Sequence, residues 1–65
     1  MITIVLTNRT VLAIQLTPDD LASFYRKVDQ RSNEWIILTG PKPGHSVIRL
    51  RLRPCDVVAV EETLP

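Results

Sequence analysis

The stretch "TPDDLASFYRKVDQR", residues 17–31, decides the fold because it carries the clearest helical pattern in the chain. Thr17 suits the N-cap, Pro18 suits the first helical position, and two aspartates follow at the positive end of the helix dipole. Apolar side chains then recur at the spacing of one face of a surface helix. We therefore expect one amphipathic helix, ended by a left-handed residue at Asn33. Its apolar stripe is Leu21, Phe24, Tyr25 and Val28.

Residues 1–17, "MITIVLTNRTVLAIQLT", alternate in the manner of a β-hairpin. A three-residue loop, Asn8-Arg9-Thr10, brings every isoleucine and leucine of the hairpin to one face, whereas a two-residue loop splits them between two faces. Burial favours the longer loop, and Asn8 tolerates the left-handed conformation that such loops often need. The shared apolar face consists of Ile2, Ile4, Leu6, Leu12, Ile14 and Leu16.

The chain after the helix predicts three more strands. "EWIILTG", residues 34–40, is apolar on both faces, whereas "GPKPGHS", residues 40–46, predicts a loop because it holds two prolines and two glycines. Residues 46–53 then alternate strictly between Ile48, Leu50 and Leu52 on one face and arginines on the other, and residues 57–62 form a last strand. The prediction is a single α+β domain over residues 1–65. Its order is β-β-α-β-β-β, with one helix packed on one face of a small antiparallel sheet.

The totals leave few ways to stabilise such a small fold. The chain has 65 residues, Lys+Arg 8 and Asp+Glu 7. Domains of this size bury about 60% of their unfolded surface and usually add disulfides, a metal or oligomerisation. One cysteine and one histidine provide neither an internal disulfide nor a structural zinc site. We predict no metal and no cofactor. We also predict no membrane partner, since no apolar run approaches the ~20 residues of a membrane span. A cytoplasmic location is the default, because a signal-peptide pattern is absent.

A homo-oligomer is therefore the first prediction for the quaternary state. One helix of about a dozen residues covers one face of the sheet, and the second face is half apolar. Exposed apolar patches mark partner surfaces, and a second copy related by a two-fold axis is the simplest partner. The alternative is that the sheet curls into a small barrel and buries both sets itself. The predicted oligomer interface is Val5, Val11, Ala13, Ile36 and Leu38.

Arg49, Arg51 and Arg53 form the one candidate site for an anion or a nucleic acid. Residues on one face of a strand lie about 6.6–6.8 Å apart, which approximates the spacing of successive phosphates. Guanidinium groups bind phosphate through paired hydrogen bonds. A platform of several aromatic side chains is missing, however, because two of the three aromatic residues belong to the helix stripe. The third, Trp35, is predicted either in the core or at an interface.

The alternative is that the three arginines are only a solvated strand face. A hairpin around residues 54–56 places Arg51 opposite Ala59 and Arg49 opposite Glu61. Opposite charges across such a ladder stabilise it by about 0.2–1 kcal/mol. This alternative predicts that residues 57–62 pair with the arginine strand.

No catalytic residue is predicted. His45 is a lone histidine in a loop, and Cys55 stands in a turn without a base beside it in the sequence. We expect a non-catalytic interaction or regulatory module that self-associates and binds a macromolecule. Protein is the first choice of partner, and a nucleic acid held by Arg49, Arg51 and Arg53 is the second.

Overall fold

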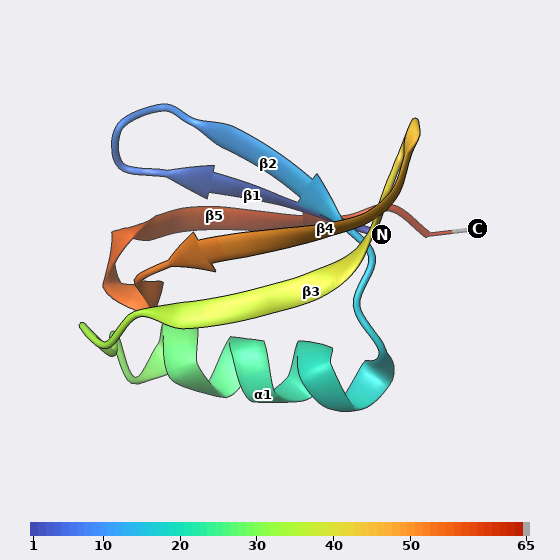
Figure 1. The fold of residues 1–65 in the computed structure, drawn as a ribbon. Helices are drawn as coiled ribbons and strands as arrows, with labels where there is room; N and C mark the ends of the chain where they lie inside the picture. Colours follow the sequence, from blue (N-terminus) through green and yellow to red (C-terminus); the bar gives the residue numbers. More distant parts are fainter. Residues whose placement is uncertain (65) are drawn as a thin grey trace.

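The computed structural model describes residues 1–64 and has one helix, one 3-10 turn and five strands (Figure 1). The α+β class, the antiparallel pairing and the order β-β-α-β-β-β are confirmed. The helix covers one side of the strands, as predicted. The elements are β1 (Ile2–Leu6), β2 (Val11–Ile14), α1 (Pro18–Asp29), β3 (Ile36–Lys42), β4 (His45–Leu52), η1 (Pro54–Asp56) and β5 (Val57–Glu62).

The strands form two antiparallel sheets, β2-β1-β5 and β3-β4. The predicted pairing of the last strand with the arginine strand is wrong, because β5 pairs with β1. The η1 turn carries the chain from one sheet to the other, and Pro54 is buried within it. In the first sheet Val60 lies opposite Ile4, so this pairing adds apolar side chains of β5 to the core.

The two sheets meet where the end of β2 approaches β3. The backbone N–H of Gln15 donates to the carbonyl of Pro41 at 2.9 Å. A Cβ built on Gly40 would overlap the carbonyl oxygen of Gln15, so only glycine allows this approach. This contact between the two sheets closes the fold on one side. The fold therefore partly resembles the small barrel that was the alternative prediction.

The predicted loop over residues 40–46 is wrong, because β3 and β4 continue to a two-residue turn. Lys42 pairs with His45 across this turn, and Gly44 has a φ of 81°. Proline followed by glycine suits a type II turn, which needs a positive φ at its third residue. Pro41 lies at a shift of register, where a missing N–H disturbs the ladder least.

The helix begins as predicted, with Thr17 Oγ1 accepting a hydrogen bond from the N–H of Asp20 at 3.2 Å. It does not end at Asn33, because Arg31 is the left-handed residue, with a φ of 50°. The N–H groups of Arg31 and Ser32 donate to carbonyls of the last helical turn at 3.0 and 3.2 Å. This pair of bonds is the Schellman motif. The left-handed residue is Arg31 because the regular hydrogen bonds of the helix end at the residue before it.

Four residues, 7–10, separate β1 from β2, one more than the predicted loop Asn8-Arg9-Thr10, and the N–H of Leu6 donates to the carbonyl of Thr10 at 2.9 Å. Ile4 therefore lies opposite Leu12, a shift of two residues from the predicted register. Such a shift leaves each side chain on its predicted face, because the side-chain period of a strand is two. Arg9 takes the left-handed conformation in place of Asn8, with a φ of 67°, while Asn8 Oδ1 accepts from the N–H of Thr10.

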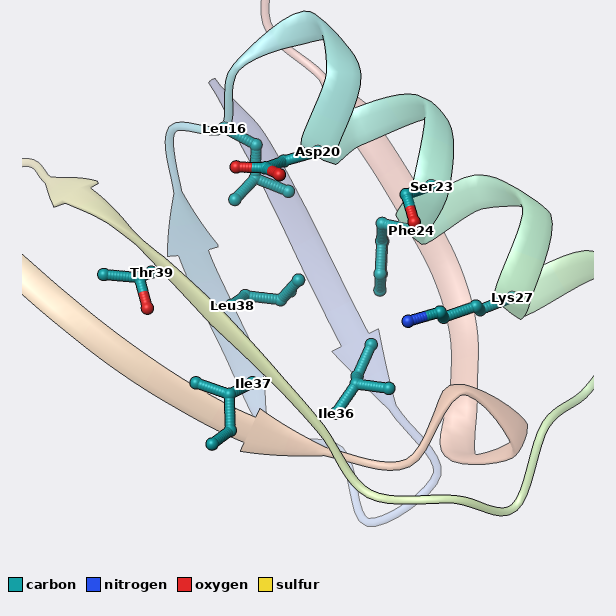
Figure 2. Close-up of a pocket in the computed structure, with 9 residues that line it drawn as sticks. All are labelled: Leu16, Asp20, Ser23, Phe24, Lys27, Ile36, Ile37, Leu38 and Thr39. Carbon is teal, nitrogen blue, oxygen red and sulfur yellow. The ribbon is translucent and has the colours of Figure 1, made fainter.

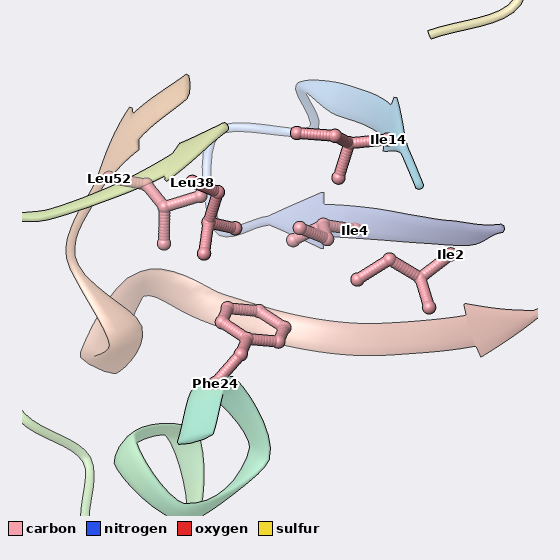
Figure 3. Close-up of a cluster of buried hydrophobic side chains, with 6 residues drawn as sticks. All are labelled: Ile2, Ile4, Ile14, Phe24, Leu38 and Leu52. Carbon is pink, nitrogen blue, oxygen red and sulfur yellow. The ribbon is translucent and has the colours of Figure 1, made fainter. Parts of the chain in front are cut away.

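The core lies between the helix and the inner faces of both sheets (Figure 3). Phe24 is 1% exposed and points from α1 toward β1. The prediction of which side chains face inward is confirmed for all nine residues assigned from the alternation. These are Ile2, Ile4, Leu6, Leu12, Ile14, Leu16, Ile48, Leu50 and Leu52, each buried or packed against the buried cluster.

Candidate functional site

The outer face of β3 and β4, which we call the arginine face, is the most distinctive surface of the molecule. Arg51 lies opposite Ile37 and Arg49 lies opposite Thr39, so a basic row runs beside an uncharged row. Inward-facing residues alternate with these positions and bury the other side of both strands. The arginine face consists of Trp35, Ile37, Thr39, Arg49, Arg51 and Arg53.

Trp35 lies on this face and is 56% exposed. The guanidinium carbons of Arg51 and Arg53 lie 4.9 and 5.3 Å from the centroid of its ring. Each such contact stabilises an exposed pair by about 0.5–1 kcal/mol. Trp35, predicted either in the core or at an interface, therefore stands among the arginines as the one aromatic side chain of this face.

The signal that could have placed Trp35 is the alternation of its own strand. Ile36 and Leu38 face the core, so Trp35 and Ile37 must face outward. Both faces of this stretch were equally good candidates for the core, because all four side chains from Trp35 to Leu38 are apolar. Only the pairing of β3 with β4 shows which face of β3 lies beside the arginines.

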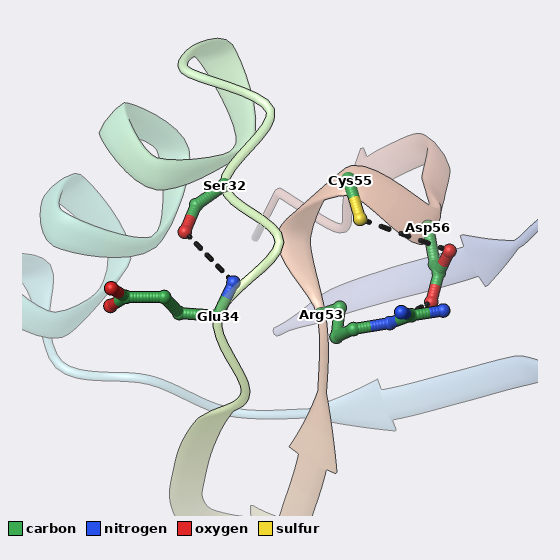
Figure 4. A network of polar contacts seen from close by, with 5 residues as sticks. All are labelled: Ser32, Glu34, Arg53, Cys55 and Asp56. Carbon is green, nitrogen blue, oxygen red and sulfur yellow. Dashed lines mark hydrogen bonds and ion pairs between the residues drawn. The ribbon is translucent and has the colours of Figure 1, made fainter.

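Two of the three arginines have no carboxylate beside them within residues 1–64. The predicted partner Glu61 lies opposite Thr3 in the other sheet. Arg53 Nε forms the one ion pair of the described chain, with Asp56 Oδ2 at 3.0 Å (Figure 4). Arg49 and Arg51 therefore keep their charge and their N–H donors available on the surface.

The residues of the predicted oligomer interface are divided by the structure. Val5, Val11 and Ala13 come together on the outer face of the first sheet, where Val5 lies opposite both Val11 and Ala59. Leu38 is 7% exposed and Ile36 packs against the core, so these two do not lie on an outer face. The prediction put them outside because either face of their strand could have been the inner one. We call Val5, Val11, Ala13 and Ala59 the valine face.

The structure does not bring His45 and Cys55 together. His45 is at the start of β4, and Cys55 lies in η1, beyond the other end of that strand. The Cys55 thiol is half-buried, and its sulfur lies 3.9 Å from Asp56 Oδ1. No group of three or more histidine, cysteine, aspartate or glutamate side chains within residues 1–64 could hold a metal ion. Nor is any helix in that range long and apolar enough to cross a membrane.

Comparison with known proteins finds no match in protein families, in curated proteins or in solved structures. Function is therefore argued from the surface alone. The arginine face carries charge, hydrogen-bond donors and an aromatic ring, whereas the valine face carries small apolar side chains.

Proposed function

We propose that the protein is a non-catalytic module that binds single-stranded nucleic acid on the arginine face. The single observation that carries this proposal is the position of Trp35 beside Arg51 and Arg53. Guanidinium groups bind phosphate through paired hydrogen bonds, and aromatic rings stack on unpaired bases. One surface thus offers both kinds of contact that single-strand binders use.

Two further observations support nucleic acid as the partner of this face. The arginines follow one strand at intervals of about 6.6–6.8 Å, close to the spacing of phosphates along an extended strand. Across β3 they meet Ile37 and Thr39, and no carboxylate neutralises Arg49 or Arg51 within residues 1–64. The proposal includes a cytoplasmic location, where the Cys55 thiol stays reduced.

Binding by this face should depend strongly on salt although the net charge is only +1. Each phosphate contact to a single strand contributes about −0.7 to the slope of log affinity against log salt concentration. Three arginine contacts therefore predict a slope of about −2. Between about 50 and 200 mM salt the affinity should fall roughly 20-fold.

The test is the binding of a fluorescently labelled oligothymidylate, followed by fluorescence anisotropy at several salt concentrations. Replacing Arg49 and Arg51 together with glutamine should weaken binding by at least about tenfold and reduce the slope by about 1.4. Arg26→Gln is the matched control, because Arg26 is exposed on α1, away from this face. Equal losses in the control and the double variant, or no binding at low salt, would refute the proposal.

Self-association through the valine face is the second candidate, and it accords with the prediction of a homo-oligomer. Val11 is 61% exposed on the edge strand β2 and lies opposite Val5, in a largely apolar surface that spans three strands and ends at Glu61 of β5. Burying such a surface against a second copy removes about 25 cal/mol of unfavourable hydration per Å². A pair of flat sheet faces related by a two-fold axis is a common way to do so.

Light scattering tests this candidate with two valines of equal exposure. Val11→Glu should convert an oligomer to a monomer, because it places charge in the apolar contact. Val47→Glu is the control, since Val47 is 62% exposed and lies on β4, outside the valine face. A wild-type protein that stays monomeric at millimolar concentration would exclude self-association.

A further inference from the structure

A groove of about 310 Å³ lies between α1 and β3 (Figure 2). Its floor is apolar and includes Leu16, Phe24, Ile36 and Leu38. Asp20 and Lys27 of α1 flank this floor, with Ser23 between them. The groove lies beside the edge of β3, where Ile37 and Thr39 of the arginine face also line it, whereas none of the three arginines does.

The edge of β3 that borders the groove has no strand partner among residues 1–64. β3 pairs with β4 on its other side, and its sheet has only these two strands. The one backbone bond on the groove side, from Gln15 to Pro41, lies at the far end of the strand. Unpaired edges present alternating N–H and C=O groups to which an extended chain can add.

The floor of the groove distinguishes this edge from the other sheet edges. β2, β4 and β5 also have one side without a ladder. A strand added to β3, however, would direct alternate side chains into a cavity between two elements. Peptide-binding domains that extend a sheet obtain affinity from the backbone bonds and specificity from such pockets.

The charges of α1 define which end groups suit an added antiparallel chain. α1 runs opposite to β3, so Lys27 lies near Ile36 at the start of the strand and Asp20 lies toward its other end (Figures 1 and 2). Neither charge has an ionic partner within residues 1–64. A chain antiparallel to β3 starts at the Asp20 end and finishes at the Lys27 end. A basic group at its start and an acidic group at its finish therefore complement the groove.

We propose that this groove binds an extended segment of a partner protein, which adds to β3 as an antiparallel strand. The segment places a β-branched or other apolar side chain on the floor, a basic residue beside Asp20 and a carboxylate beside Lys27. This is a protein-binding site separate from the three arginines, so neither proposal depends on the other.

The test uses two synthetic peptides and the isotopically labelled protein. The first peptide is Lys-Thr-Val-Thr-Glu, whose lysine, valine and glutamate share one face of an extended strand, and the second reverses its end charges, Glu-Thr-Val-Thr-Lys. Nuclear magnetic resonance should show shifts of the backbone amides of Ile36–Thr39 on addition of the first peptide. The second should bind about tenfold more weakly, because it brings like charges to both ends of the groove. Two versions of the first peptide carry methyl groups on alternate backbone nitrogens, one at the odd and one at the even positions. The version methylated at the nitrogens that face β3 should not bind, because it lacks the N–H donors of the ladder.

Variants of α1 provide matched controls. Ser23→Tyr should fill the groove and reduce binding of the first peptide at least tenfold, whereas Ala22→Tyr, exposed on the same helix, should leave binding unchanged. Lys27→Gln should weaken binding about threefold, and Arg26→Gln should not.

Several outcomes would overturn the peptide proposal. The first is an absence of shifts at Ile36–Thr39 at millimolar peptide. The others are equal affinity for the two peptides, full affinity of both methylated peptides, or equal effects of the tyrosine variants at positions 22 and 23. Arg49→Gln should leave peptide binding unchanged, so a failure here and a failure of nucleic-acid binding remain distinguishable.

Discussion

The guanidinium carbon of Arg51 lies 4.9 Å from the centroid of the Trp35 ring. The contact joins two adjacent strands, and it restrains a long side chain that otherwise samples many rotamers. A restrained guanidinium loses less conformational entropy on binding an anion, so the ring prepares the arginine for a partner. Trp35 is also the only tryptophan of the chain, so its fluorescence reports directly on this face.

Trp35→Ala should weaken binding of oligothymidylate by about tenfold, because stacking of one base on an aromatic ring is worth about 1–3 kcal/mol. The free energy of unfolding should change by less than about 2 kcal/mol, since the ring is exposed and only two cation–π contacts are lost. Anisotropy titration and urea denaturation measure the two quantities. Trp35→Phe is the control and should keep part of the affinity. A larger loss of stability than of affinity would mean that the ring supports the fold rather than a ligand.

Arg9→Gly and Arg31→Gly should each raise the free energy of unfolding by about 1 kcal/mol. Both arginines have a positive φ, at 67° and 50°, which glycine adopts without the steric cost of a Cβ. Urea denaturation measures the change. Arg26→Gly, in the interior of α1, is the control and should lower stability by about 1 kcal/mol. Destabilisation by all three variants would contradict the assigned conformations of the two turns.

Gly40→Ala should lower the free energy of unfolding by about 2 kcal/mol or more, because the added Cβ overlaps the carbonyl oxygen of Gln15. The hydrogen bond from Gln15 to Pro41 should weaken at the same time, which hydrogen exchange of the Gln15 amide detects. Gly44→Asn is the control: it has open space around its Cβ position, and asparagine tolerates its left-handed backbone. If the Gln15 amide exchanges equally slowly in the Gly40→Ala protein, the two sheets do not meet there as described.

The stability of the protein should fall between about pH 10 and pH 12 because of Tyr25. Partial burial of this phenol, its hydrogen bond to Glu62 Oε1 and the negative charge of Glu62 raise its pKa from 10.0 to about 12. The unfolded chain therefore loses the phenolic proton at a lower pH than the folded chain does, and ionisation favours unfolding within this window.

Tyr25 is the only tyrosine, so the ultraviolet absorbance of tyrosinate measures its pKa directly. Glu62→Gln should lower that pKa toward its ordinary value, because it removes the negative charge. Glu61→Gln is the control, since Glu61 lies on the opposite face of β5 and should leave the titration unchanged. Titration at the ordinary pKa in the wild-type protein would show that the Tyr25–Glu62 bond is absent in solution.

Local patterns predicted most of the elements and their inward faces. Strand pairing was harder to predict, because it depends on which of several distant strands buries more apolar surface. The N-cap Thr17 and the alternation of β1, β2 and β4 depend on neighbours in the chain, so they were readable. The predicted pairing of β4 with β5 rested on opposite charges, which contribute about 0.2–1 kcal/mol per pair, and on an apolar face in which Leu52 meets Val58 and Leu50 meets Val60. In the structure Val57 and Val60 of β5 are half-buried against the core, whereas Val58 is 64% exposed. Pairing with β1 therefore adds Val57 and Val60 to the core, whereas the predicted hairpin would have added Val58 and Val60.

The candidate site was predictable in part for the same reason. The arginines share a face because they alternate along one strand, which is a local property. Their neighbour Trp35 comes from another strand, and its place depends on the pairing of β3 with β4. The groove between α1 and β3 depends on how the helix packs, so no single stretch of sequence indicates it.

The first strand occupies the middle of its sheet, and its second partner is the last strand of the chain. During translation β1 and β2 can pair early, but one side of β1 stays without its ladder until β5 has left the ribosome. Contacts between such distant segments slow folding, because loop closure must precede them. The nascent protein therefore keeps an aggregation-prone edge on β1 until its synthesis has passed β5.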